Sequence, residues 1–328
     1  MADRRTGTIS HWRQLSPLLA VFRLQPAPGR PFPDYKGGQY IALRRDDCRL
    51  TRKVVDDHGQ VRYLPELDEM GRQKRGPVTH SYSISSAPFE TRRDGHLEFY
   101  VVLEVDSTSG LGRLTEALFA LHQRDGAPLD YVDRIAGDFT LDKRAAGFES
   151  VLLVGTGTGL APFASMVKQL DHEAAEGKRP PFRLTLLHAN RTRQELAYHE
   201  ELCAIEGSRR FDFVYLPSLS RVGGGGPLAD GLATGRANNL LRLVFEMPLR
   251  EEEDGDGAAL ARVVRPALPR GLSREPLRRR LDPAKTVVLT CGNASSMADI
   301  KRIAEALEMR FEKEDWKPAS RAEQVGRE

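Results

Sequence analysis

The sequence predicts a protein of class β + α/β, with an N-terminal antiparallel Greek-key β-barrel followed by a doubly wound parallel sheet. The first half consists of short extended runs separated by turn residues, as in antiparallel barrels. The second half repeats the order buried strand, loop, helix, which predicts parallel strands covered by helices on both faces. A length of 328 residues is sufficient for two domains with separate cores.

The barrel domain is expected to occupy residues 1–147. Its clearest strands are the stretches LAVFRLQP, GQYIALRR, HSYSISSAP and HLEFYVVLEV, the last of which is dense in strand-forming residues. Residues 44–77, approximately, are rich in charge and show no hydrophobic period. We interpret them as an insertion between two strands, with a small hairpin around residues 57–60.

The parallel-sheet domain is expected at residues 148–318. Four strands define it, in the stretches SVLLVGTGTG, PFRLTLLHAN, FDFVYLPSLS and KTVVLTCGN. Residues 245–284, approximately, carry an acidic block, REEEDGDG, and then a basic block, REPLRRR, and are expected to form a solvated insertion. Residues 319–328 are expected to be a polar tail.

Composition limits the possible classes of function. With 40% hydrophobic and 29% charged residues the chain is typical of globular proteins, and a net charge of +3 does not indicate nucleic-acid binding. No apolar run approaches the ~20 residues of a transmembrane helix, so no membrane insertion is expected, and the N-terminus lacks the apolar segment of a signal peptide. The three cysteines are far apart, which favours a cytoplasmic protein and cannot supply a four-thiolate iron–sulfur cluster; no metal site is expected.

A glycine-rich loop follows the first strand of the second half. Glycines let a backbone approach a ligand closely, and a helix N-terminus offers free N–H groups to a pyrophosphate. The order strand, loop, helix therefore predicts nucleotide binding, the alternative being a packing turn without a ligand. The residues concerned are Gly155, Thr156, Gly157, Thr158 and Gly159, with Pro162 in the first helical turn.

Five stretches in a specific order carry a resemblance to a known family. They are HSYSISSAP, GLGRLTEAL, GTGTGLAPF, LLHANRTRQELAYHEEL and CGNASSMADIKR. The chain resembles the ferredoxin–NADP reductase superfamily, and most of all its bacterial ferredoxin/flavodoxin reductases, from KGGQYIAL to EDWKP apart from the two insertions. The resemblance implies a barrel that binds FAD and a parallel-sheet domain that binds NADP.

For the flavin side, the resemblance implies that Tyr82 stacks on the isoalloxazine ring and that the Ser83 hydroxyl lies near N5. The alternative for Tyr82 is an ordinary half-buried strand residue. The arginine that the family uses on the flavin pyrophosphate is replaced by His80, which carries a full charge only part of the time near neutral pH. Arg113 is a possible substitute.

The same resemblance implies a pyrophosphate loop in GLGRLTEAL, and therefore FAD rather than FMN, because FMN has one phosphate. Trp316, in EKEDWKP, is expected either to cover the flavin or adenine or to pack in the core. The residues expected in the pyrophosphate loop are Gly112, Arg113, Leu114 and Thr115.

For the nicotinamide side, arginines are expected to select NADPH over NADH by binding its 2′-phosphate, since the guanidinium fork suits phosphate. The alternative for each is a solvated surface cation. The TCGN turn is implied to lie under the nicotinamide, with Cys291 beside the reacting carbon; a small buried hydrophobe is the alternative. The residues concerned are Arg191, Ser220, Arg221 and Arg236 for the phosphate, and Cys291, Gly292 and Asn293 for the turn.

The resemblance implies an enzyme that passes hydride from NADPH to FAD and then single electrons to an acidic protein, ferredoxin or flavodoxin. Cationic sites such as Arg92, Arg93 and residues 278–280 are candidate docking points. Two alternatives stay open: a reductase component that supplies a monooxygenase, and a non-catalytic flavin- or nucleotide-binding sensor.

Overall fold

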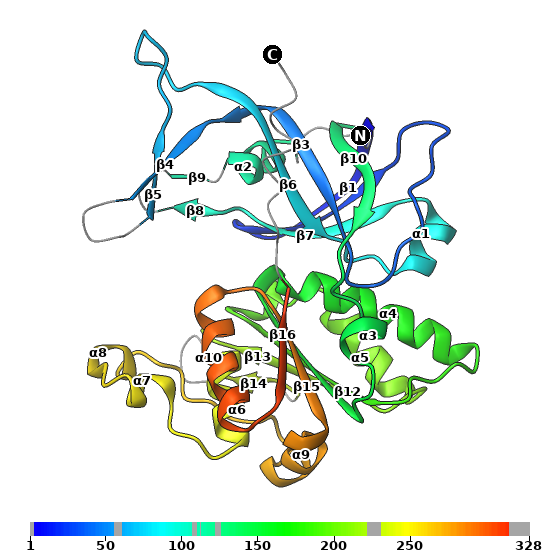
Figure 1. Ribbon diagram of the computed structural model, residues 1–328, viewed down its shortest axis with the longest axis vertical. Coiled ribbons are helices and arrows are strands. Elements are labelled where there is room, and N and C mark those ends of the chain that lie inside the picture. The colour runs from blue at the N-terminus through cyan, green and yellow to red at the C-terminus, as the bar shows by residue number, and fades with distance from the viewer. Residues whose placement is uncertain are drawn as a thin grey trace.

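The computed structural model describes residues 3–55, 61–106, 110–111, 113–121, 126–221 and 231–314. Six strands of the first half form one antiparallel sheet that curls around its own core, and this confirms the predicted barrel-type domain (Figure 1). In sheet order the strands are β6 (Arg75–Ser83), β3 (Tyr40–Arg49), β10 (Pro128–Ala136), β1 (Arg4–Ser16), β2 (Leu19–Gln25) and β7 (Leu97–Val102). Stacked rings of Phe22 and Phe99 lie in this core, 5.1 Å apart.

The charged insertion of the first half is shorter than the sequence indicated. Strand β3 continues to Arg49 and β6 starts at Arg75, because the backbones pair as far as Arg49 and Arg75 while carboxylates such as Glu116 accept from the charged side chains. What remains of it in the described chain, residues 50–55 and 61–74, projects from the barrel as an arm (Figure 1). It contains the antiparallel hairpin of β4 (Thr51–Val55) and β5 (Val61–Pro65), as predicted from the turn sequence.

Smaller elements complete the first half. They are the helices α1 (Pro88–Asp94) and α2 (Arg113–Phe119) and the two-stranded ribbon of β8 (Val105–Asp106) and β9 (Gly110–Leu111).

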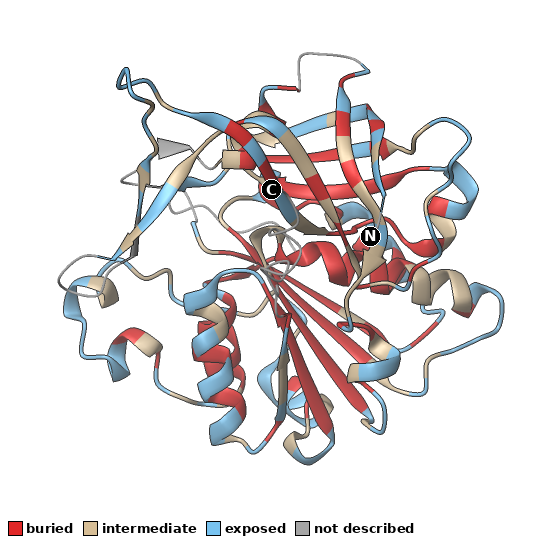
Figure 2. Cartoon of the chain, turned by 45° about the horizontal axis from the view of Figure 1, so that its top comes forward, coloured by how far each residue is buried: buried red, intermediate tan, exposed pale blue. Residues whose placement is uncertain are grey.

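The second half contains a parallel six-stranded sheet, as the strand–helix alternation predicted. Most of its strands are buried on both faces (Figure 2). In sheet order the strands are β14 (Ala233–Thr234), β13 (Phe213–Leu219), β12 (Arg183–Asn190), β11 (Ser150–Thr156), β15 (Thr286–Cys291) and β16 (Arg310–Lys313). Its helical elements are α3 (Leu141–Arg144), η1 (Gly157–Leu160), α4 (Ala161–Ala175), η2 (Arg193–Glu195), α5 (His199–Ser208), α6 (Ala237–Val244), α7 (Arg250–Glu253), α8 (Gly257–Leu260), α9 (Arg274–Arg280), η3 (Pro283–Lys285) and α10 (Ala294–Ala306).

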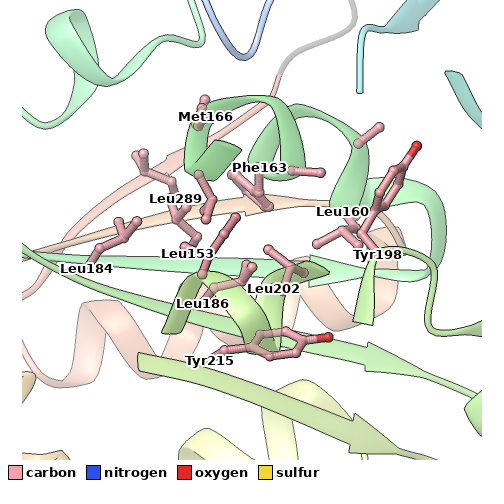
Figure 3. Packing of buried hydrophobic residues seen from close by; sticks show 14 of the residues in the cluster. Leu153, Leu160, Phe163, Met166, Leu184, Leu186, Tyr198, Leu202, Tyr215 and Leu289 are labelled. Carbon is pink, nitrogen blue, oxygen red and sulfur yellow. The ribbon is translucent and has the colours of Figure 1, made fainter. Parts of the chain in front are cut away.

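Alternate residues of each strand supply the two faces of this sheet. On β11, Leu153 belongs to the core under α4 and α5, together with Phe163 and Leu202 (Figure 3). Its neighbour Leu152 belongs to the opposite core, under α6 and α10. Because successive side chains alternate between two buried cores, the strand sequence is almost continuously apolar.

The second insertion is not the solvated excursion that its charge predicted. Its acidic and basic blocks form α7 and α9, and Leu249, Leu277 and Leu281 are buried under them. Charged residues dominate the sequence there because they alternate with these few apolar anchors. Arg280 of the basic block is itself a structural residue, since its guanidinium bonds to Asp212 at 2.6 Å.

The two halves meet across a polar interface between α1 and α4. Lys168 of α4, with a side chain 3% exposed, forms an ion pair of 2.6 Å with Glu90 of α1. Tyr198 donates a hydrogen bond of 2.9 Å to Glu98 and accepts one of 2.8 Å from the Ser85 hydroxyl, both on the barrel side. These buried contacts fix the orientation of the barrel on the parallel sheet.

Candidate functional site

One large cavity lies between the curled sheet and the carboxyl ends of the parallel strands. Its volume is about 1090 Å³, just above the roughly 300–1,000 Å³ of ordinary ligand pockets. The carboxyl edge of a parallel sheet is where ligands bind in doubly wound folds. On the barrel side it is lined by Leu18, Leu19, His80, Ser81, Tyr82, Ser83, Tyr100, Val101, Val102, Glu104, Leu114 and Thr115. On the sheet side it is lined by Thr156, Gly157, Thr158, Gly159, Ala161, Ala189, Asn190, Arg191, Ser220, Arg221, Arg236, Ala237, Asn238, Arg250, Cys291, Gly292, Asn293, Ser295 and Ser296.

The end of β6 brings Tyr82 and Ser83 into this cavity. Pairing with Tyr40 and Ile41 of β3 fixes the position of both residues. Tyr82 packs partly on the barrel core, and burial raises the pKa of its phenol, so the ring is a neutral, mainly apolar surface. Ser83 is 5% exposed and presents its hydroxyl at the junction of the two halves.

Two glycines of the loop after β11 have different structural roles. A side chain at Gly159 would lie 2.1 Å from the carbonyl oxygen of Cys291, so this glycine permits close packing of η1 on β15. Gly157 has φ +57° and open space around its Cα, and it lines the cavity. The packing explanation therefore accounts for Gly159, whereas Gly157 leaves the backbone accessible to a ligand.

The turn after β15 lies directly against the glycine loop. Gly292 has φ +125°, and a side chain there would meet the Thr156 oxygen atoms at 2.3 Å. The Asn293 N–H donates to Thr156 Oγ1 at 2.7 Å, and its side chain caps α10 by accepting from the Ser296 N–H at 3.0 Å. The two turns form one continuous wall, with Cys291 at its end.

A carboxylate that the sequence interpretation missed joins the two halves of the site. Glu314, which follows β16, accepts hydrogen bonds from Ser83 Oγ at 2.9 Å and from Cys291 Sγ at 2.9 Å. It is 6% exposed, and burial raises its pKa above the usual range. Burial and the neighbouring Glu314 also raise the pKa of Cys291, so its thiol stays protonated. Its only signal in the sequence is the stretch EKEDWKP, in which the predicted functional residue was Trp316 and not Glu314.

The arginines expected to bind the nucleotide differ in how far carboxylates of the protein already neutralise them. Arg191 lines the cavity, but both oxygens of Glu195 accept from its guanidinium, at 2.6 and 3.1 Å. Arg221 and Arg236 line the same cavity; Arg236 is 64% exposed and lies 3.5 Å from Glu251. Ser220 is also in the wall. Arg250, from the second insertion, was not predicted and is the fourth arginine there.

Other predicted residues are distributed as follows. Leu114 and Thr115, at the start of α2, line the cavity, and Thr115 Oγ1 accepts from the Glu104 N–H at 3.2 Å. Arg113 does not line it, although its charge acts on His80. Pro162 is buried in the first turn of α4 and lies outside the cavity wall. Gly112 and Trp316 are outside the described residues.

His80 is exposed within the cavity wall. Desolvation by the surrounding protein, together with the positive charge of Arg113, holds its pKa below the usual value of 6.5. The imidazole is therefore mostly neutral at neutral pH.

Comparison with known proteins agrees with this geometry. The family model for the oxidoreductase NAD-binding domain matches residues 153–226. The flavohemoprotein of Bordetella pertussis is 32% identical over 179 residues, which is 52% of this chain and 36% of that protein. The flavodoxin/ferredoxin–NADP reductase of Rhodobacter capsulatus is 28% identical over 181 residues, 54% of this chain and 59% of that protein. Methane monooxygenase component C of Methylosinus trichosporium is 31% identical over 176 residues, 53% of this chain and 45% of that protein. The match therefore spans about one third to three fifths of these relatives.

Solved structures share the fold over nearly the whole chain. A ferredoxin NADP⁺ reductase from Neisseria gonorrhoeae, with bound FAD and NADP, has a TM-score of 0.56 at 18% identity, covering 95% of this chain and 99% of that one. The FAD/NAD-binding domain of a nitric oxide dioxygenase from Vibrio cholerae has a TM-score of 0.58 at 19% identity, covering 96% and 99%.

The fold and the site define a two-domain protein with a curled antiparallel domain, a parallel-sheet domain that matches the oxidoreductase NAD-binding domain over residues 153–226, and a large cavity between the two. The chain shares the fold of a ferredoxin NADP⁺ reductase, and residues 153–226 match the oxidoreductase NAD-binding domain. Among the described residues, no helix is both long and apolar enough to cross a membrane.

The residues present fit FAD and NADP, the two groups bound in the reductase from Neisseria gonorrhoeae. The barrel side offers an apolar ring, Tyr82, beside a small hydroxyl, Ser83, in a cavity large enough for more than a single small ligand. The sheet side offers the open backbone of Gly157 and the arginines near it, which suit a phosphorylated nucleotide.

Proposed function

We propose that the protein is an FAD-dependent NADPH oxidoreductase that delivers electrons singly to a separate ferredoxin or flavodoxin. Bound FAD would supply the conversion of one hydride, accepted from NADPH at N5, into two single electrons and a released proton. The observation that carries the proposal is the meeting of Ser83, from the barrel, and Cys291, from the parallel sheet, at one carboxylate inside a shared cavity.

The side chains at this junction would set the geometry of transfer. Tyr82 offers a flat surface on the barrel side, and Cys291 with Gly292 forms the opposite wall. Reacting atoms must approach within about 3–3.5 Å, so Ser83 and Cys291 act by defining that gap. Because burial raises its pKa, the Glu314 carboxyl can hold a proton beside the Ser83 hydroxyl, so that no solvent water is needed to carry that proton.

Preference for NADPH over NADH is proposed from the cations at the far end of the cavity. Arg221 makes no ion pair within the described part of the chain, and Arg236 is more than half exposed. A 2′-phosphate would find there the guanidinium of Arg221 and that of Arg236, whose contact with Glu251 is 3.5 Å long and leaves the side chain 64% exposed. Arg191 contributes less, because Glu195 already neutralises it.

Colour and bleaching test the proposed redox function. Purified protein should be yellow with one FAD per chain, and anaerobic NADPH should bleach it. A colourless protein that still binds nucleotide would instead support the non-catalytic sensor. NADH that bleaches it as efficiently as NADPH would contradict the proposed nucleotide preference.

A reductase that supplies a monooxygenase is the second candidate. The likeness to methane monooxygenase component C favours it, although the three cysteines of this chain cannot hold a four-thiolate cluster. Cytochrome c reduction with added ferredoxins, flavodoxins or an oxygenase component distinguishes the candidates. Stimulation by a ferredoxin or flavodoxin supports the first, and stimulation by the oxygenase component alone supports the second.

The surface that meets the acceptor is proposed to be the arm and the β8 ribbon, which lie on the same side of the barrel (Figure 1). Exposed apolar patches mark interaction sites. Cations Arg52, Lys53 and Lys74 are exposed beside the apolar residues, which suits an acidic electron carrier. The arm leads into β6, whose far end carries Tyr82. The exposed large apolar side chains of the described chain are Val55, Tyr63, Leu67, Met70 and Val105.

The basic helix α9 is a poor alternative to this surface. It lies at the end of the molecule opposite the barrel (Figure 1), and Arg278 and Arg279 are paired with glutamates at 3.0 Å. The double variant Leu67→Asp/Met70→Asp should lower ferredoxin- or flavodoxin-dependent cytochrome c reduction while ferricyanide reduction stays unchanged. The matched variant Arg279→Asp should alter neither, and the reverse pattern would place docking on α9.

A further inference from the structure

The second insertion contributes a cation to the nucleotide cavity. Arg250 is the first residue of α7 and lines the cavity beside Ser295 and Ser296 of α10. Its chain neighbours Leu249 and Glu251 are 7% and 6% exposed, so both are anchored in the protein interior. The start of α7 is therefore a fixed part of the cavity wall, in a segment whose composition predicted a solvated excursion.

The guanidinium of Arg250 is held in place on one side only. Its Nη1 donates to the carbonyl and hydroxyl oxygens of Ser295, at 3.1 and 2.7 Å, and its Nε donates to Asp254 at 3.1 Å. The side chain is 25% exposed. No acceptor among the described residues bonds to Nη2. The group thus keeps N–H donors for a ligand and loses little rotamer freedom on binding one.

A buried polar network sets the position of α7 relative to the cavity. Arg242 of α6 is 1% exposed and bonds twice to Asp299 of α10, at 2.7 and 3.0 Å. It also donates to the carbonyl of Pro248, two residues before α7, at 2.9 Å. Asn239 donates to Glu251 at 2.8 Å. Because these groups are buried and paired, they tie α6, α7 and α10 into one rigid unit around Arg250.

The charges around the cavity favour an anion at this place. Within the described wall, Glu104 is the one acidic residue, and it lies on the barrel side. Arg191 is neutralised by Glu195. Arg221, Arg236 and Arg250 also line the sheet side. Arg236 lies 3.5 Å from one oxygen of Glu251, and Arg250 meets Asp254 through Nε alone, which leaves its Nη2 directed to no carboxylate among the described residues. The wall there therefore presents more cationic than anionic groups.

We propose that Arg250 binds the 2′-phosphate of NADPH and thereby makes the second insertion a determinant of nucleotide specificity. The proposal rests on the proposed function, since it assumes that the cavity takes a nicotinamide nucleotide. A terminal phosphate dianion offers several acceptors, and the free donors of a pre-positioned guanidinium match them. NADH has a hydroxyl at the same position and gains much less from the cation.

Binding of nucleotide fragments to the purified protein tests this assignment without any turnover. Isothermal titration with adenosine 2′,5′-bisphosphate and with 5′-AMP separates the contribution of the 2′-phosphate. Arg250→Ala should weaken binding of the bisphosphate roughly 10- to 100-fold, as expected for loss of hydrogen bonds to a charged group. Binding of 5′-AMP should change much less. Arg250→Lys, which keeps the charge, should recover part of the lost affinity for the bisphosphate. It replaces the alanine variant in the test if that variant folds poorly.

Arg265→Ala is the matched control, because Arg265 belongs to the same insertion, is 77% exposed and is absent from the cavity wall. It should bind both fragments like the unmodified protein. If the unmodified protein prefers the bisphosphate and both Arg250 variants keep that preference, the assignment of Arg250 is wrong and the proposed function stands. If the unmodified protein binds neither fragment, the proposed function itself fails and this inference with it.

Discussion

Ser83 Oγ donates a 2.9 Å hydrogen bond to Oε1 of Glu314, although 231 residues separate them in the chain. The bond joins the last residue of a barrel strand to the residue that follows the last strand of the parallel sheet. Since Cys291 donates to the other oxygen of the same carboxylate, one buried group holds the two predicted walls of the reacting gap. The gap therefore depends on Glu314 as much as on Ser83 and Cys291.

Ser83→Ala should slow flavin reduction while FAD stays bound. Loss of the hydroxyl removes one anchor of Glu314 but leaves the Tyr82 ring in the wall. A misplacement of the gap by about 1 Å can cost on the order of 100-fold in rate. Stopped-flow absorbance with anaerobic NADPH measures the step. An unchanged reduction rate in a variant that retains its flavin would refute the assigned role.

Glu314→Gln should make the stability of the protein less sensitive to pH. Burial raises the pKa of Glu314 above its ordinary 4.5, so the folded protein binds a proton more readily than the unfolded chain does. The free energy of unfolding therefore falls as pH rises from about 4.5 through the raised pKa, and is lowest above it. Glutamine cannot ionise and removes this loss. Urea unfolding between pH 4 and pH 9 compares the two; parallel curves would contradict the prediction.

His80→Arg should tighten FAD binding and remove its pH dependence. The pKa of His80 lies below 6.5, so the imidazole carries little charge at pH 8 and gains it only as the pH falls. FAD affinity of the unmodified protein should thus rise from pH 8 to pH 5.5. A permanent guanidinium should increase FAD affinity at pH 8 by about tenfold, because it adds one charge-assisted hydrogen bond to the ligand. Fluorescence titration of apoprotein measures it.

His11→Arg makes the same change of charge on β1, at an exposed position outside the cavity wall. It should leave FAD affinity unaltered at both pH values. Equal tightening in both variants would mean that overall charge, and not a contact at residue 80, is responsible.

Much of this architecture could be predicted from local sequence patterns, because the short apolar run of β11 and the glycine loop after it are local signals. The contribution of Glu314 could not, since it depends on the pairing of β16 with β15 and the docking of the barrel. Arg250 was hidden for another reason: its acidic neighbours indicate solvent exposure, whereas Leu249 and a paired Glu251 bury that segment. Long-range pairing, not local propensity, decides both positions.

Lys168→Met should destabilise the fold at the interface between the halves. The ion pair with Glu90 is largely buried, and removal of one partner leaves an uncompensated charge, at a cost of roughly 3 kcal/mol. The double variant Lys168→Met/Glu90→Gln should recover part of that loss. Lys301→Met, which breaks an exposed pair on α10, should cost less than about 1 kcal/mol. Urea unfolding of the four proteins measures these differences; equal losses for the two lysines would contradict a structural role of the interface pair.

Gly157→Ala and Gly159→Ala should separate nucleotide binding from packing in the same loop. At Gly157, alanine meets no neighbour within 4 Å, and its positive φ costs only about 1–2 kcal/mol, so the variant should fold. Its methyl group would enter the cavity and weaken NADP⁺ binding by about tenfold or more. At Gly159, alanine would overlap the Cys291 carbonyl and should lower stability by roughly 1–3 kcal/mol or more, whatever the ligand. Thermal unfolding and titration with NADP⁺ report the two effects independently. If a folded Gly157→Ala protein keeps full NADP⁺ affinity, the loop does not bind the nucleotide and is instead a packing turn.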